Sequence, residues 1–185
     1  MSTLNSKFLN LCKKNSCFKL VPFIEKDFLT YNYNKPQEFF INFWNKYELF
    51  KKKFKSINKK EINNSFNGAA LEIILAYLFT RENIQIYKMD ENIDIKFVKP
   101  DFILIGKSKK KFFISVKVSL RERWKQADWE AIKYKDKYPN SKCFLVINNK
   151  KEYNSMKEKI EFLSLDNVFF ANSNDLNEMI NLIKN

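Results

Sequence analysis

A short alternating segment in the middle of the chain, KFFISVKVS at residues 111–119, constrains the fold most. Successive side chains of a β-strand point to opposite faces of the sheet. One apolar face, which we expect to be the core face, carries Ile114, Val116, Val118 and Leu120. The other face carries Phe113, Ser115, Lys117 and Ser119. Because burying an unpaired ammonium group is costly, Lys117 needs either an acidic partner or a path to solvent at the sheet edge.

The segments around this strand alternate between helical and strand-like patterns. Helical spacing of apolar side chains predicts helices over residues 36–54, 67–80, 121–137, 151–163 and about 174–184, the last with Ser173 or Asn174 as its cap. Further strands are predicted over residues 84–88, 101–106, 143–148 and 168–171. The polar turn at 106–109 predicts an antiparallel hairpin with the segment 111–119. This order predicts an α/β fold, with a mixed central β-sheet flanked by helices.

Three segments have more than one interpretation. The aromatic stripe of helix 36–54 favours a core or subunit contact over a base-stacking platform. The basic segment 51–60, KKKFKSINKK, is predicted to be a solvated loop, with phosphate contact as the alternative. Gly68 and the alanines after it would let helix 67–80 approach another backbone closely. Apolar side chains before residue 36 are expected to pack against the main body: Phe8, Leu9, Leu11, Phe18, Leu20, Val21 and Phe23.

The composition limits the classes of function. A formal net charge of +13 at pH 7 predicts a polyanionic partner, with nucleic acid ahead of a membrane surface, although lysines that only keep the surface soluble are the alternative. The chain has no histidine, which excludes histidine-based acid–base catalysis and Cys/His zinc sites. Cys12, Cys17 and Cys143 have no paired spacing, and no segment is apolar for long enough to span a bilayer. We therefore expect free thiols and a cytoplasmic protein without a membrane partner.

Asp101 is the first candidate for chemistry. It follows Pro100 and opens the strand that is predicted to pair with 111–119, so that antiparallel pairing would bring it beside Ser115 and Lys117. Carboxylate oxygens are ligands that Mg²⁺ prefers, and a bound cation can activate water for phosphodiester hydrolysis. A nearby lysine can orient that water or stabilise the developing charge. The alternative is structural, because Pro-Asp is also a common turn dipeptide.

Two further acids could complete such a centre, although Ser115 stands where a carboxylate ligand would be usual. One helical face carries Arg123, Gln126, Ala127 and Glu130. If this face is turned to the cleft, the Glu130 carboxylate could enter the space left by the short Ser115 side chain. Glu72 could approach from helix 67–80. The alternative for each is a surface acid, which for Glu130 would pair with Lys133 or Tyr134.

The residues Gly68 with Glu72, Pro100-Asp101, Ser115-Val116-Lys117 and Glu130 together resemble the PD-(D/E)XK nuclease superfamily. The run KVSLRERWKQ at 117–126, followed by Glu130, is more narrowly similar to the EcoRII and NgoMIV group of type II restriction endonucleases, in which the second acid has moved from the strand to the following helix. The resemblance covers about residues 66–148. It implies a restriction-endonuclease-like αβββαβ core at 66–148, within one nuclease domain that also has an N-terminal helical part (1–65) and a C-terminal part (149–185).

The resemblance implies cleavage of double-stranded DNA by a homodimer, or a tetramer, with Mg²⁺ as cofactor. It implies metal ligation by Asp101, Glu130 and Glu72, with Lys117 and Ser115 as the other catalytic positions. It also implies a site that contains CC/GG steps and a cognate DNA methyltransferase as a functional partner. The residues expected to contact DNA are Arg121, Glu122, Arg123, Lys125 and Gln126.

The physical chemistry of that cluster agrees with base reading. Arginine can pair bidentately with guanine, and a carboxylate can accept a hydrogen bond from cytosine N4. The alternative is a phosphate clamp without base reading. Two other functions also stay open: a structure-specific or repair nuclease of the same fold, and a basic DNA-binding module whose catalytic site is dead because Ser115 replaces the acid. Mg²⁺-dependent cutting into discrete fragments would separate these three functions.

Overall fold

The structure is a computed structural model that describes residues 28, 30–58, 64–87, 95, 98–106, 109–121 and 123–185. Some residues named above lie outside this described part: the apolar side chains before residue 28, the cysteines Cys12 and Cys17, and Glu122. The helices are α3 (Pro36–Asn58), α4 (Asn64–Arg81), α5 (Arg123–Lys137), α6 (Lys150–Lys157), the short 3₁₀ helix η2 (Ile160–Phe162) and α7 (Asp175–Lys184). The strands are β1 (Gln85–Tyr87), β2 (Phe102–Ile105), β3 (Lys111–Lys117), β4 (Lys142–Ile147) and β5 (Asn167–Phe170).

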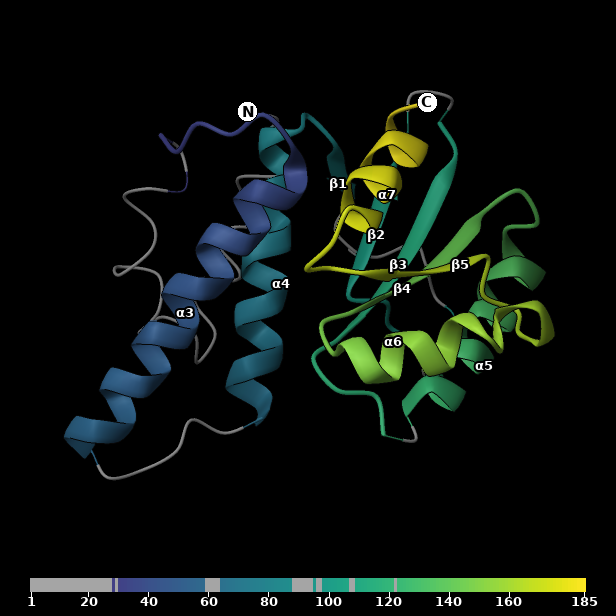
Figure 1. The fold of residues 1–185 in the computed structure, drawn as a ribbon. Coiled ribbons are helices and arrows are strands. Elements are labelled where there is room, and N and C mark those ends of the chain that lie inside the picture. Colours follow the sequence, from purple (N-terminus) through teal and green to yellow (C-terminus); the bar gives the residue numbers. More distant parts are fainter. Residues whose placement is uncertain are drawn as a thin grey trace.

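The strands form one mixed sheet in the order β1-β2-β3-β4-β5. β1, β2 and β3 are antiparallel neighbours, and Phe102 of β2 pairs with Ile114 of β3, which confirms the predicted hairpin. β3, β4 and β5 are parallel, so their carboxyl ends meet at one edge of the sheet. Figure 1 shows the helices on both sides of this sheet. The predicted fold class, an α/β fold with a mixed central sheet flanked by helices, is therefore confirmed.

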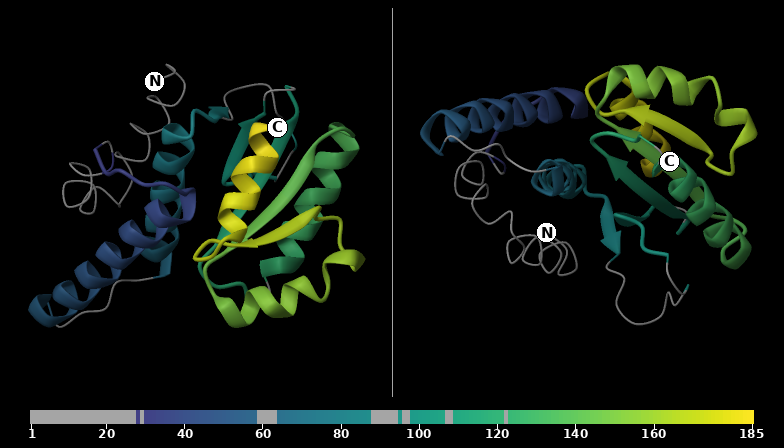
Figure 2. Two further views of the ribbon diagram at one scale, coloured as in Figure 1. Left: turned by 45° about the horizontal axis from the view of Figure 1, so that its top comes forward. Right: turned by 90° about the horizontal axis from the view of Figure 1, so that it is seen from below.

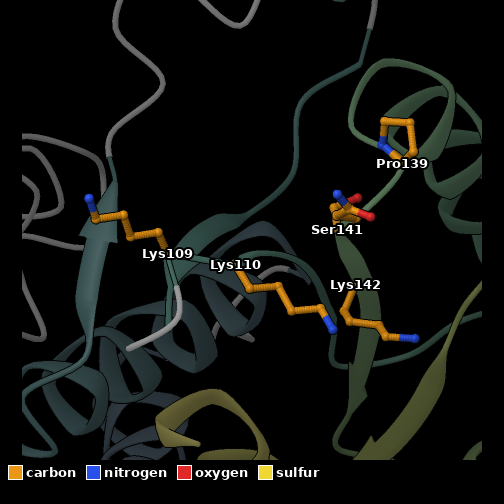
Figure 3. A pocket seen from close by; sticks show the side chains of 6 residues that line it. Lys109, Lys110, Pro139, Ser141 and Lys142 are labelled. Atoms are coloured by element: carbon orange, nitrogen blue, oxygen red, sulfur yellow. The ribbon is translucent and has the colours of Figure 1, made fainter.

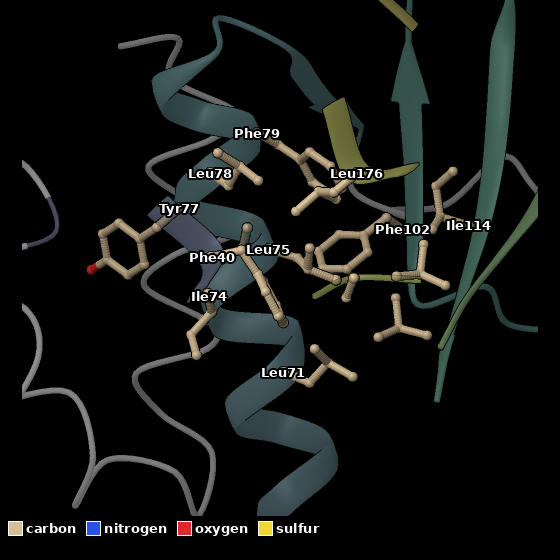
Figure 4. Packing of buried hydrophobic residues seen from close by; sticks show 14 of the residues in the cluster. Phe40, Leu71, Ile74, Leu75, Tyr77, Leu78, Phe79, Phe102, Ile114 and Leu176 are labelled. Atoms are coloured by element: carbon tan, nitrogen blue, oxygen red, sulfur yellow. The ribbon is translucent and has the colours of Figure 1, made fainter. Parts of the chain in front are cut away.

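Both faces of the sheet are buried, which corrects the expectation of a single core face. Ile114 and Val116 belong to a cluster with α3, α4 and α7, whereas Phe113 belongs to a second cluster with α5 and α6. Figure 4 shows Leu75 and Phe79 of α4 directed toward Phe102 of β2 in the first cluster. Leu120 was expected to lie with Ile114, but it packs in the second cluster, because β3 ends at Lys117 and the alternation ends with it.

The aromatic stripe of α3 lies in the first cluster, as expected for a core contact. Phe39, Phe43 and Tyr47 are fully buried, and the Phe43 ring lies 4.2 Å from that of Phe28. α3 also continues to Asn58, so the prediction of a loop is wrong for residues 51–58. Phe54, half-buried four residues after Phe50, continues the inner stripe, and this apolar spacing lets the basic segment remain helical. Figure 2 shows that α3 packs across α4 at an angle, since its right-hand view looks down the axis of α4 but shows α3 along its length.

Three local expectations change. α4 begins at Asn64 rather than at Gly68. A Cβ built at Gly68 would meet no heavy atom of the described residues within 4 Å, so none of the described segments makes the close backbone approach expected there. The helix predicted over 151–163 ends at Lys157 and is followed by η2. At the start of α7, either Ser173 or Asn174 was expected to be the cap. The Ser173 hydroxyl accepts the backbone N–H of Asp175 at 3.3 Å, whereas the Asn174 side-chain oxygen accepts a hydrogen bond from the side-chain amide of Asn177.

Two further features of the described part bear on the expectations. The Cys143 thiol is free and buried, and burial raises its pKa to about 12. None of the helices in the described ranges has both the length and the hydropathy that crossing a bilayer requires.

Candidate active site

Asp101 and Lys117 meet at the carboxyl end of the central strand β3. The pairing of Phe102 with Ile114 places Asp101 level with Ser115, as the predicted hairpin requires. The Asp101 Oδ2 atom accepts the backbone N–H of Val116 and lies 3.0 Å from the Lys117 Nζ atom. Both side chains are largely buried, with exposed fractions of 21% for Asp101 and 16% for Lys117. Lys117 is therefore held in an ion pair on an inner strand rather than released to solvent at a sheet edge.

Glu130 reaches the same region from α5. Its Oε2 atom lies 3.5 Å from the Ser115 hydroxyl oxygen, and its Oε1 atom accepts a hydrogen bond from Gln126 at 2.8 Å. Only 4% of the residue is exposed, so the alternative of a surface acid is wrong. Burial raises the pKa of Glu130, and the negative charge of Asp101 raises it further, although the Gln126 hydrogen bond and the positive charge of Lys117 oppose the shift.

Glu72 belongs to the same electrostatic centre from the opposite face of the sheet. It lies on α4, which packs on the face of the sheet away from α5. Burial, together with the negative charge of Asp101, raises the pKa of Glu72 to about 7, and the charge of Lys117 opposes the shift. The charge of Lys117 thus acts on Glu72 and Glu130 as well as on its ion-pair partner Asp101.

The chemistry of these side chains fits a hard divalent cation. All three acids offer oxygen ligands, and a bound cation would stabilise the charged forms that burial disfavours in Glu72 and Glu130. Within the described ranges, no three acidic or thiol side chains are already gathered closely enough to form a metal site.

The residues expected to contact DNA follow directly after β3. Arg121 and Arg123 are exposed at the start of α5, as are Lys125 and Gln126, while Glu122 lies outside the described residues. Arg123 donates a hydrogen bond from Nη2 to the backbone carbonyl of Ser119 at 2.8 Å. Gln126 donates a side-chain hydrogen bond to Glu130, so a residue expected to contact DNA directly contacts one of the candidate metal ligands.

Glu152 was not among the residues singled out from the sequence, yet it contacts the loop that carries these arginines. Its carboxylate accepts the backbone N–H of Leu120 at 2.7 Å and that of Arg121 at 3.3 Å. The sequence around it, Asn149-x-x-Glu152, has the spacing of a helix cap, and the Asn149 side chain does accept the Glu152 N–H. Nothing in that local pattern indicates a contact with residues thirty positions earlier in the chain.

A cavity of about 560 Å³ lies elsewhere, at the opposite end of the sheet. Figure 3 shows Lys109, Lys110 and Lys142 around it, together with Pro139 and Ser141. Lys110 precedes β3 and Lys142 opens β4, so this cavity lies at the amino ends of the two parallel strands. The acids and Lys117 lie at or near the carboxyl end of β3, and this cavity is therefore not part of the candidate active site.

The comparisons with known proteins support the fold. No protein-family model and no curated protein matches the chain. Among solved structures, the chain is similar to restriction endonuclease PspGI in a complex with its substrate DNA. The TM-score is 0.59 and the identity is 16%, over 98% of this chain and 82% of the other. At this level of identity the similarity bears on the fold, and the chain has the α/β fold of a restriction endonuclease.

Proposed function

We propose that this protein is a Mg²⁺-dependent type II restriction endonuclease that hydrolyses double-stranded DNA at a short specific site. The observation that carries the proposal is the arrangement of Asp101, Lys117 and Glu130 around the short side chain of Ser115. A carboxylate from the following helix lies where the strand has none, as in the EcoRII and NgoMIV group that the sequence resembles. The similar fold of an endonuclease solved with its substrate DNA supports the same conclusion.

In the proposed site, Asp101, Glu130 and Glu72 would hold the cation. A cation held there would supply Lewis-acid chemistry, which activates water and stabilises negative charge on the phosphate. Asp101 is oriented by the backbone N–H of Val116, and it in turn fixes the Lys117 ammonium group near the reacting phosphate. From that position, Lys117 can orient the attacking water and stabilise negative charge as it develops on the phosphate oxygens.

The proposed recognition residues are the exposed arginines at the start of α5. Arg121 and Arg123 could each pair bidentately with a guanine, and Glu122 could accept from cytosine N4, which favours sites with CC/GG steps. Lys125 adds positive charge on the same exposed turn of α5. A homodimer would place one active site at each strand of the duplex, so we propose a homodimer as the active form.

The test is to incubate the protein with unmethylated phage DNA and Mg²⁺ and to sequence the fragment ends. We expect discrete fragments whose ends share one short sequence, and no fragments when a chelator removes the metal. Asp101→Asn should bind DNA without cutting it. Nicking at junctions or damaged sites would favour a structure-specific nuclease of the same fold. Binding with no Mg²⁺-dependent cutting would favour the catalytically dead DNA-binding module.

A further inference from the structure

Glu152, in the first turn of α6, contacts the loop between β3 and α5. Its Oε2 atom accepts the Leu120 N–H at 2.7 Å, and its Oε1 atom accepts the Arg121 N–H at 3.3 Å and the Ser119 hydroxyl at 3.4 Å. A carboxylate can accept several hydrogen bonds at once, and bonds to a charged acceptor are stronger than those between neutral groups. One side chain thus binds three consecutive residues of the loop.

The loop has an unusual backbone conformation at the residue that Glu152 holds. Arg121 has a φ of 45°, in the left-handed region that residues with a Cβ rarely adopt. Leu120, the preceding residue, is 2% exposed and anchored in the second core cluster. The carbonyl of Leu120 accepts the Arg123 N–H at 2.7 Å, where α5 begins. The conformation of this short loop therefore decides where the side chains of Arg121 and Arg123 leave the backbone.

Glu152 is itself held by rigid parts of the fold. The side chain of Asn149 accepts its backbone N–H at 3.2 Å, which fixes the first turn of α6. Just before that turn, Asn148 donates its backbone N–H to the carbonyl of Lys117 at 3.2 Å, so the end of β4 is joined to the end of β3. The Glu152 carboxylate thus links the carboxyl ends of β3 and β4, where Lys117 lies, to the loop that follows β3.

We propose that Glu152 is a positioning residue for DNA sequence recognition, which holds Arg121 and Arg123 in register with the catalytic Lys117. This role rests on the proposed function. Glu152 binds the loop, and within the described part of the chain it forms no hydrogen bond with Asp101, Lys117 or Glu130. Weakening the hydrogen bonds between Glu152 and the loop should therefore reduce the discrimination between DNA sequences more than it reduces the rate of cleavage on the cognate site.

The variant that tests this role is Glu152→Gln, which keeps the shape but offers one acceptor oxygen in place of two. Glu158→Gln is the matched control, because Glu158 is an exposed acid at the end of the same helix and loses the same charge. We expect the ratio of kcat/KM on the cognate site to that on a site with one base pair changed to fall about tenfold in Glu152→Gln. The single-turnover rate at saturating cognate DNA and the Glu158→Gln ratio should stay close to wild type.

Hydrogen exchange provides a second measurement that does not depend on activity. In the wild-type protein the amides of Leu120 and Arg121 should exchange slowly, and they should exchange faster in Glu152→Gln but not in Glu158→Gln. Wild-type exchange at the rate of an open loop would overturn the proposal, even if Glu152→Gln failed to fold. A wild-type protein that cuts one sequence, with an unchanged ratio in Glu152→Gln, would overturn this role alone. A wild-type protein that cuts no DNA with Mg²⁺ would overturn the proposed function as well.

Discussion

Ser115 on β3 and Glu130 on α5 are both buried and meet in the candidate active site. Ser115 is short enough to leave room beside Lys117, and the Glu130 carboxylate comes within 3.5 Å of its hydroxyl from α5. Two carboxylates at this point would repel each other, and burial would strengthen the repulsion. The serine is thus compatible with the proposed site, in which the acid would come from the helix instead of the strand.

Replacing Glu130 tests this reading of the site directly. Glu130→Gln should lower Mg²⁺-dependent cleavage by about a hundredfold or more, because a metal ligand contributes several kcal/mol to the transition state. DNA binding without metal should persist, and Glu161→Gln, which alters an exposed acid, should cut like wild type. The measurement is the single-turnover cleavage rate on a duplex with one site. Adding Ser115→Glu to Glu130→Ala should restore part of that rate, and wild-type cutting by Glu130→Gln would exclude Glu130 as a ligand.

Asp166 gives a prediction on stability and pH. Its carboxylate accepts the Cys143 N–H at 2.8 Å and lies 2.7 Å from Lys142 and 2.9 Å from Lys135. Burial alone would raise the pKa of Asp166, but these hydrogen bonds and charges outweigh it and hold the pKa below its usual value. A carboxyl group whose pKa is lowered by folding stabilises the protein above its unfolded pKa, and that stabilisation is lost as the pH falls through the folded pKa.

Asp166→Asn should therefore lower the free energy of unfolding by about 2 kcal/mol at pH 7. The difference from wild type should shrink as the pH falls below about 4, the usual pKa of an unfolded aspartate. Urea unfolding at several pH values measures this, with Asp136→Asn on the exposed side of α5 as the control. A difference that stayed constant down to pH 2 would contradict the lowered pKa.

At the scale of elements, the two glycines of the chain have opposite surroundings. A Cβ at Gly106, just after β2, would lie 2.6 Å from the backbone carbonyl oxygen of Ile183 in α7 and 2.9 Å from the Phe112 ring. Gly106 therefore allows α7 to pack closely against the hairpin. Gly68, in the first half of α4, faces open space among the described residues.

The pair makes a matched prediction. Gly106→Ala should lower the free energy of unfolding by about 2 kcal/mol, because α7 or the turn must shift to avoid the clash. Gly68→Ala should raise it by up to about 1 kcal/mol, because alanine favours a helix over glycine and its Cβ would meet no described neighbour within 4 Å. Denaturant unfolding measures both. A stable Gly106→Ala protein would show that α7 does not pack on the hairpin as described.

At the scale of the whole molecule, basic side chains lie at both ends of the sheet, but only one end carries the candidate active site. The last turns of α3, with Lys52 and Lys53 exposed, lie at the same end of the molecule as the loop after β3 (Figure 1). Lys109 and Lys110 lie at the opposite end, beside the cavity of Figure 3. On the proposed function, we therefore expect phosphate contact from the α3 lysines rather than from Lys109 and Lys110.

DNA affinity as a function of salt concentration tests this difference. The double variant Lys52→Gln/Lys53→Gln should weaken binding equally on all sequences and reduce the slope of log K against log salt by about two, one for each phosphate contact. Lys109→Gln/Lys110→Gln removes the same charge at the other end and should leave the slope nearly unchanged. Equal effects of the two variants would mean that the net charge acts without a defined binding face.

Much of the fold could be predicted because its signals are local. Alternation along residues 111–117 and the polar turn after Gly106 predicted the β2–β3 hairpin, and the spacing of Arg123 to Glu130 predicted a helix face directed at the strand. The loop predicted at 51–60 was wrong, because charge suggested exposure while the spacing of Phe50 and Phe54 kept α3 helical. Leu120 was assigned to the wrong face because alternation continues in the sequence after the strand has ended.

The sequence by itself predicted that Asp101 would lie beside Lys117, because the short polar turn joins the two strands as a hairpin and the length of that turn sets their register. Only the tertiary structure decided that Glu72 shares their electrostatic centre, that Glu152 holds the loop after β3, and that α7 packs against Gly106. These contacts join residues far apart in the chain. These contacts depend on how the helices pack on the two faces of the sheet, and the local spacing of apolar residues in the sequence does not indicate that packing.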